Sequence, residues 1–168
     1  MQSVTQAEKV IQWMAQCQHP DAQNLFEILS LLSIPGQIKT LASDLEVHDL
    51  LQKGLPVKSV RSLVNKTGFS AKELSMAMPI KERALLRLIA DTSRTARLSS
   101  QESDVLWRFA AVFAKAQEVM GTAEYAKGWL CSEARSLRYR KPIDVLSLSP
   151  GAELVLRVLN QLLYGVYL

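Results

Sequence analysis

The chain has 168 residues, of which 48% are hydrophobic and 21% are charged, and its formal net charge is +4. This length suits one domain or two small ones, and the composition is that of a soluble globular chain rather than a disordered, collagenous or disulfide-rich one. Unbroken apolar runs are far shorter than the roughly 20 residues of a transmembrane helix. The N-terminus lacks the basic and apolar regions of a secretory signal. Cys17 and Cys131 are far apart and form no Cys-x-x-Cys pair, which favours a reducing cytoplasm as the location.

The positive charge is concentrated in the middle of the chain. Residues 1–53 hold three basic and six acidic residues, whereas residues 54–97 hold nine basic and three acidic ones, a net charge of +6. Residues 98–168 are nearly balanced at +1. A compact basic patch is typical of a protein that binds polyanions, although a solvated basic face explains charge alone equally well.

Apolar residues recur with a helical period nearly everywhere, and no alternating run bounded by hairpin turns indicates a strand. The sequence therefore predicts an all-α protein. In the N-terminal part, we expect helices over residues 8–18 and 21–32 and one or two short helices between residues 38 and 52. The core positions of the second of these helices are Leu25, Ile28, Leu29 and Leu32.

The central segment predicts three short helices, over residues 56–66, 70–78 and 81–90. Gly54 is expected to cap the preceding helix and Pro56 to take the first position of the next. Ser70 and Glu73 have the spacing of a capping box. The predicted core positions of the three helices are Val57, Val60, Leu63, Val64, Leu74, Ala77, Leu85, Leu88 and Ile89.

The last segment begins with a second capping box, Ser99 to Glu102, which opens a long helix ending near Met120. Its predicted core stripe, spaced by three and four residues, is Leu106, Phe109, Phe113, Ala116 and Met120. Further helices are expected over residues 123–130, 142–148 and 152–163, the last of them after Pro150-Gly151. Aromatic and small residues predicted to face the core here are Trp107, Tyr125, Ala126 and Trp129.

Three short helices joined by tight turns, the third of them basic, describe a helix-turn-helix unit. In such a unit the second helix crosses the DNA backbone and the third lies in the major groove, where Arg reads guanine and nearby cations bind phosphate. Spacing alone is a weak signal, because similar units occur in proteins that never contact DNA. The candidate DNA-binding residues are Lys72, Lys81, Arg83, Arg87, Arg94 and Arg97.

A series of short motifs follows in order along the last two thirds of the chain. They are Gly54-Leu55-Pro56, Gly68-Phe69-Ser70, Leu98 to Asp104, Ala123 to Leu130, Lys141 to Leu146 and Tyr164 to Leu168. Each motif alone is unspecific, but the series resembles the Xre/MbcA/ParS-type antitoxins of bacterial toxin–antitoxin pairs. The chain departs from the family pattern at the third helix, which carries Lys81 and Ala84, at the turn from Arg138 to Lys141, and at Leu163.

The resemblance implies a helical bundle with a central Xre-like helix-turn-helix and a C-terminal helical toxin-binding domain. The predicted domains are residues 1–53, a helical region of unknown role, residues 54–97, the helix-turn-helix, and residues 98–168, the toxin-binding domain. The implied partners are operator DNA, a second copy of the chain in a homodimer, and a toxin of the RES-domain type, an enzyme that consumes NAD. The antitoxin would cover the active site of this toxin, partly with its C-terminal end.

Two groups of residues are candidates for toxin contact: a basic loop that can meet an acidic rim, and an apolar tail that can fill a pocket. They are Arg135, Arg138, Arg140, Lys141, Tyr164, Val166, Tyr167 and Leu168. The simpler alternatives are a solvated loop and a tail packed on its own domain.

Few residues favour an enzyme. His19 and His48 are the only histidines, they have no metal-ligand spacing, and no phosphate-binding glycine loop is present. We expect no cofactor, metal ion, small-molecule substrate or membrane contact. Two alternatives to a DNA-binding antitoxin remain open: a toxin-binding or adaptor protein without specific DNA binding, and a stand-alone helix-turn-helix regulator.

Overall fold

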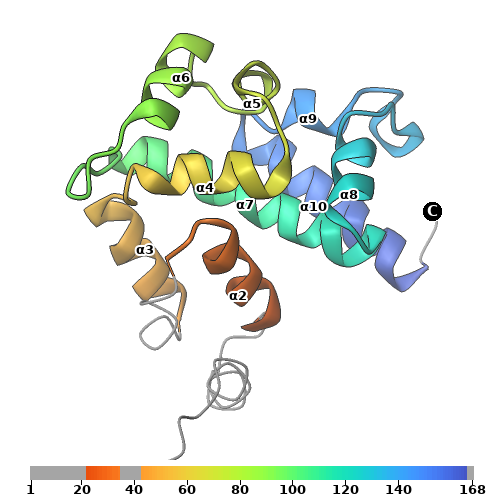
Figure 1. Ribbon diagram of the computed structural model, residues 1–168. Coiled ribbons are helices and arrows are strands. Elements are labelled where there is room, and N and C mark those ends of the chain that lie inside the picture. The colour runs from red at the N-terminus through yellow and green to blue at the C-terminus, as the bar shows by residue number, and fades with distance from the viewer. Residues whose placement is uncertain (1–21, 35–42, 166–168) are drawn as a thin grey trace, which may run out of the picture.

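The computed structural model describes residues 22–34 and 43–165 of the chain (Figure 1). Every regular element in these residues is a helix, so the predicted all-α class is confirmed, while the helix expected over residues 8–18 lies outside them. The elements are α2 (Ala22–Leu31), α3 (Asp44–Lys53), α4 (Lys58–Thr67), α5 (Ala71–Ala77), α6 (Glu82–Ala90), α7 (Ser100–Met120), α8 (Ala123–Leu130), a 3-10 turn (Arg135–Leu137), α9 (Pro142–Val145) and α10 (Ser149–Tyr164).

Helix α7 is the centre of the fold, and α2, α3, α4, α8 and α10 all pack against it (Figure 1). Its predicted apolar stripe is buried, apart from the half-buried Met120. The buried surface is wider than one stripe, because Ala110, Val112 and Ala114 are buried as well. A helix that is apolar on several faces forms the interior of a domain, and α7 has this role here.

Helices α4, α5 and α6 form the helix-turn-helix unit, with α6 packed against both of the others. Gly68 ends α4 with a φ of 69°, a left-handed conformation that glycine adopts without steric cost. Ser70 and Glu73 form the predicted capping box at the start of α5. Phe69 lies between Gly68 and Ser70 and is 1% exposed. Its ring makes edge-to-face contacts with the rings of Phe109 and Phe113 in α7. This turn is therefore fastened to the central helix.

The start of α4 differs from the prediction. Pro56 does not open the helix, which begins at Lys58, but pairs with Arg97 in an isolated bridge. Backbone hydrogen bonds from Val57 N to the oxygen of Ala96 and from Leu98 N to the oxygen of Leu55 flank this bridge. The bridge joins the two ends of the helix-turn-helix segment, and long-range pairing of this kind leaves no local signal in a sequence.

Two further expectations for the C-terminal part are wrong. Tyr125 is 69% exposed rather than in the core, because α8 turns Ala126 and Leu130 inward instead. Helix α10 begins at Ser149, so Pro150 lies inside its first turn, where no backbone N–H donor is needed. Trp107 and Trp129 are half-buried against the core.

Gly151 and Gly128 offer a matched test of the packing between α9 and α10. A Cβ atom on Gly151 would lie 1.7 Å from the backbone oxygen of Val145, whereas one on Gly128 would meet nothing within 4 Å. Gly151→Ala should therefore lower the free energy of unfolding by about 1–3 kcal/mol. Gly128→Ala should raise it by about 0.5–1 kcal/mol, because alanine favours a helix. Urea denaturation of both variants measures this, and equal effects would contradict the close approach.

Candidate functional site

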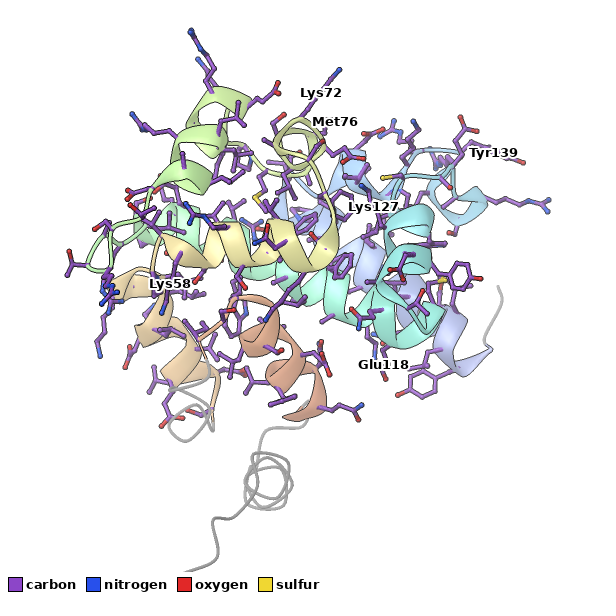
Figure 2. The ribbon with its side chains drawn as sticks, viewed as in Figure 1. Lys58, Lys72, Met76, Glu118, Lys127 and Tyr139 are labelled. Carbon is purple, nitrogen blue, oxygen red and sulfur yellow. The ribbon has the colours of Figure 1, made fainter. Side chains whose placement is uncertain are left out.

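The outer face of α6 is basic and open to solvent. Lys81, Arg83 and Arg87 are exposed, while Leu85 is fully buried beneath them. Leu88 and Ile89, both expected in the core, are half-buried at its edge. Figure 2 shows nitrogen-tipped side chains projecting from α6 away from α4. This arrangement presents a helix with cationic side chains that has the size and charge to enter a major groove.

The other predicted DNA-binding residues surround α6 to different degrees. Lys72 on α5 is exposed and points outward (Figure 2), and Arg94 is exposed in the loop after α6. Arg97 is exposed too, but its Nη1 donates a 2.6 Å hydrogen bond to the backbone oxygen of Gly54. Arg61, which was not among the predicted residues, donates from Nε to the oxygen of Ile89 at 2.7 Å and so holds the end of α6. The guanidinium groups of Arg97 and Arg61 are thus partly engaged by the fold.

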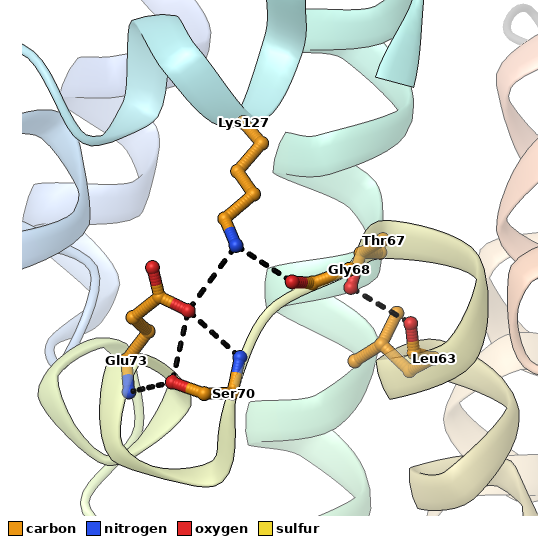
Figure 3. A network of polar contacts seen from close by, with 6 residues as sticks. All are labelled: Leu63, Thr67, Gly68, Ser70, Glu73 and Lys127. Atoms are coloured by element: carbon orange, nitrogen blue, oxygen red, sulfur yellow. Dashed lines mark hydrogen bonds and ion pairs between the residues drawn. The ribbon is translucent and has the colours of Figure 1, made fainter. Parts of the chain in front are cut away.

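A polar network connects the helix-turn-helix unit to α8 (Figure 3). The ammonium of Lys127 donates to the backbone oxygen of Gly68 at 2.6 Å and to Glu73 Oε2 at 3.3 Å. The same nitrogen lies 5.0 Å from the ring centroid of Phe69, within the range of a cation–π interaction. Lys127 therefore fixes the turn before α5 relative to α8.

The same network determines the acidity of Glu73. The hydrogen bond from the Ser70 backbone N–H lowers the pKa of this carboxyl below its ordinary value of 4.5, against a smaller opposing effect of burial. The Ser70 hydroxyl and the Lys127 ammonium lower the pKa further. Glu73 is thus held as a carboxylate at the junction of the two segments.

The basic loop predicted for toxin contact is a tight turn on the surface, and we name residues 135–141 the basic turn. Arg135, Arg138, Arg140 and Lys141 are all exposed. Leu137 is buried and holds the turn on the core. Tyr139, which the sequence did not single out, is 65% exposed at its tip (Figure 2).

The second predicted toxin-contact region lies at the end of α10. A shallow groove of about 550 Å³ is lined by Glu153, Leu156, Arg157, Asn160, Gln161 and Tyr164. Tyr164 is 74% exposed at one end of it, and Leu148, Leu154 and Leu163 are also exposed on or beside this helix. The tail residues Val166, Tyr167 and Leu168 lie outside the described residues.

Little else in the described part of the chain suggests chemistry. Cys131 at the end of α8 is half-buried, and burial raises the pKa of its thiol, which weakens it as a nucleophile. Within residues 22–34 and 43–165, no cluster of His, Cys, Asp or Glu side chains has the geometry to hold a metal ion. No helix among these residues has the length and hydropathy to cross a membrane.

These features define a class: a helix-turn-helix protein with an attached helical domain that presents basic and apolar surface. Comparison with known families makes the assignment specific. Residues 46–111 match the antitoxin Xre-like helix-turn-helix domain, and residues 115–165 match the antitoxin Xre/MbcA/ParS C-terminal toxin-binding domain. The chain belongs to the Xre/MbcA/ParS antitoxins.

The chain is also similar to a curated protein and, in its fold, to a solved structure. The chain is 29% identical over 136 residues to the Antitoxin Xre of Pseudomonas putida, a match that covers 81% of this chain and 80% of the relative. Its fold is similar to a chain in the crystal structure of the M. tuberculosis MbcT–MbcA toxin–antitoxin complex, with a TM-score of 0.51 and 23% identity. That similarity covers 67% of this chain and 96% of the other, and it supports the fold alone.

Sequence reasoning missed several residues that position these surfaces. Ser43 and Glu46 form a third capping box at the start of α3, and their Ser-x-x-Glu spacing was a usable signal. Lys127 and Phe69 carried no such signal, because their partners are far away in the chain.

Replacement of Glu73 by Gln tests the junction through its pH dependence. A depressed pKa stabilises the folded state above about pH 4.5, and this contribution is lost as the pH falls through the lowered pKa of the folded state. Glu73→Gln keeps an oxygen that can accept hydrogen bonds but has no charge. The variant should be less stable than wild type at pH 7, and the difference should shrink toward pH 3. Urea denaturation at both pH values measures it, and a difference independent of pH would contradict the assignment.

Proposed function

We propose that this chain is a cytoplasmic antitoxin that binds and neutralises a cognate toxin through residues 98–168. The observation that carries the proposal is the uncovered surface of α10, where a groove and exposed Leu154, Leu163 and Tyr164 lie within the segment that matches the toxin-binding family. The structure leaves this surface without a partner among the described residues. Its burial against another protein would contribute about 1.5–3 kcal/mol for each large apolar side chain.

Neutralisation by occlusion needs a tight interface, because a small fraction of free toxin remains harmful. Interfaces of this kind bury about 1,600 Å² or more. The groove on α10 supplies part of this area, and in this proposal the residues that follow Gly165 in the sequence, Val166 to Leu168, supply more of it. In this proposal the tail enters the active site of the toxin, and the basic turn contacts its rim.

The toxin that we propose is a RES-domain enzyme that consumes NAD. The support is the order of motifs through the last two thirds of the chain, which resembles antitoxins of such pairs. Its reaction makes the level of cellular NAD a direct measure of neutralisation.

Co-expression with the product of the adjacent reading frame tests this function. The full chain should preserve growth and cellular NAD, whereas removal of residues 164–168, or Leu154→Arg on α10, should reduce both toward the level with toxin alone. Leu45→Arg is the matched control, because Leu45 is an equally apolar, 69% exposed side chain on α3. None of these changes alters α7, the helix at the centre of the core. Full protection by both the truncated chain and Leu154→Arg would refute the proposal.

A second function is supported by the exposed cations on α6. We propose that residues 54–97 bind the operator of the chain's own operon, with Arg83 and Arg87 at base edges and Lys72, Lys81, Arg94 and Arg97 at phosphates. In a homodimer the two reading helices would lie about 34 Å apart, one turn of DNA, which predicts a palindromic site.

Binding to the promoter fragment of the operon tests the DNA function. Arg83→Ala or Arg87→Ala should each weaken specific binding by about 1–3 kcal/mol, whereas Arg157→Ala on α10 should not. With about six phosphate contacts, the slope of log K against log salt should be about −5. Equally weak binding to all sequences would favour an adaptor instead, and specific DNA binding without any toxin binding would favour a stand-alone regulator.

A further inference from the structure

The tip of the basic turn has an unusual backbone. Arg138 has φ 55° and ψ 45°, and Tyr139 follows it with φ 62°, so two consecutive residues with side chains occupy the left-handed region. Glycine and asparagine adopt this conformation readily, whereas a bulky residue such as tyrosine adopts it only at a cost in free energy. The sequence thus has tyrosine, which is strained in this conformation, at a position where glycine or asparagine would be unstrained.

The backbone of this turn is firmly held. Ala134 O accepts hydrogen bonds from the N–H groups of Leu137 and Tyr139, each at 3.0 Å. Ala134 N in turn donates to the oxygen of Arg140 at 3.1 Å. Together with the buried side chain of Leu137, these bonds determine the conformation without help from the side chain of Tyr139.

The side chain of Tyr139 is only partly covered by its own fold. It is 65% exposed, and its hydroxyl makes no hydrogen bond with any residue that the structure describes. A strained backbone conformation persists where the surrounding structure holds it in place, and such conformations are concentrated at functional sites. The hydrogen bonds of the turn hold its backbone but give no role to the ring of Tyr139, which leaves the ring available for a contact with a partner.

The surroundings of Tyr139 indicate the kind of partner. The basic turn carries four exposed cations, Arg135, Arg138, Arg140 and Lys141, and no acidic residue. Tyr and Arg are enriched among the residues that dominate protein–protein interfaces, where an aromatic anchor fills a pocket and charges lie around it. A complementary partner has an apolar pocket with an acidic rim.

We propose that Tyr139 is the anchor of the toxin interface, inserted into an apolar pocket of the toxin while the cations of the basic turn meet an acidic rim. This inference rests on the proposed antitoxin function and names a residue and a surface for it. A protein fits better than nucleic acid as the partner, because the turn lies in the segment matching the toxin-binding family, outside residues 46–111. Figure 2 also shows Tyr139 at the end of the molecule away from α6.

Tyr139→Asn separates the two roles of this position, because asparagine tolerates the left-handed backbone but lacks the ring. Its melting temperature should equal or exceed that of wild type, while its affinity for the purified product of the adjacent reading frame should fall by about 30-fold, as expected for an interface hot spot. Tyr139→Phe should bind within about threefold of wild type. Tyr125→Ala, at a similarly exposed tyrosine on α8, should also change the affinity less than about threefold.

Calorimetric titration and thermal denaturation give both readouts from the same samples. A folded Tyr139→Asn variant that binds the toxin as wild type does would overturn this inference and leave the proposed function standing. A loss of promoter binding with unchanged toxin affinity would also overturn it, since the turn would then be a nucleic-acid contact. Absence of toxin binding by the wild-type chain would overturn both proposals.

Discussion

The packing of Phe69 against Phe109 and Phe113 joins the two functional halves of this molecule. Phe69 belongs to the turn before α5, whereas its two ring partners belong to the central helix. Lys127 covers the same ring from α8 and binds the carbonyl oxygen before it. The rings and the ammonium hold this turn against α7 and α8, so the orientation of the helix-turn-helix unit relative to these helices depends on them.

Two of the candidate binding surfaces are the faces of α6 and α10 that point away from the core. Helix α10 covers α7 with Ala152, Val155 and Leu159, and this leaves the opposite face of α10 exposed with its groove. Helix α6 likewise buries Leu85 and presents its cations outward. Because one core supports both surfaces, each is presented by a rigid helix rather than by a loop, which favours a preorganised interface.

The basic turn differs from α6 and α10, because its candidate contact residues lie on a turn and not on a helix. Its backbone is rigid, yet the residues at its tip contribute exposed charge and an exposed ring instead of packing. A chain selected for stability alone would place glycine or asparagine in such a turn. The presence of Arg138 and Tyr139 there is consistent with a surface whose stability is completed by a partner.

The helices and their class followed from the sequence alone, because helical period, capping boxes and punctuation by Gly and Pro are local properties. Ser70 and Ser99 were recognised as caps for this reason, and the order of motifs was sufficient to indicate the family. Tertiary structure alone decided the bridge between Pro56 and Arg97, the exposure of Tyr125 and the partners of Lys127. The bridge and the partners of Lys127 depend on residues far apart in the chain. The exposure of Tyr125 depends on which side of a short helix packs against its neighbour, and no local sequence pattern predicts any of the three.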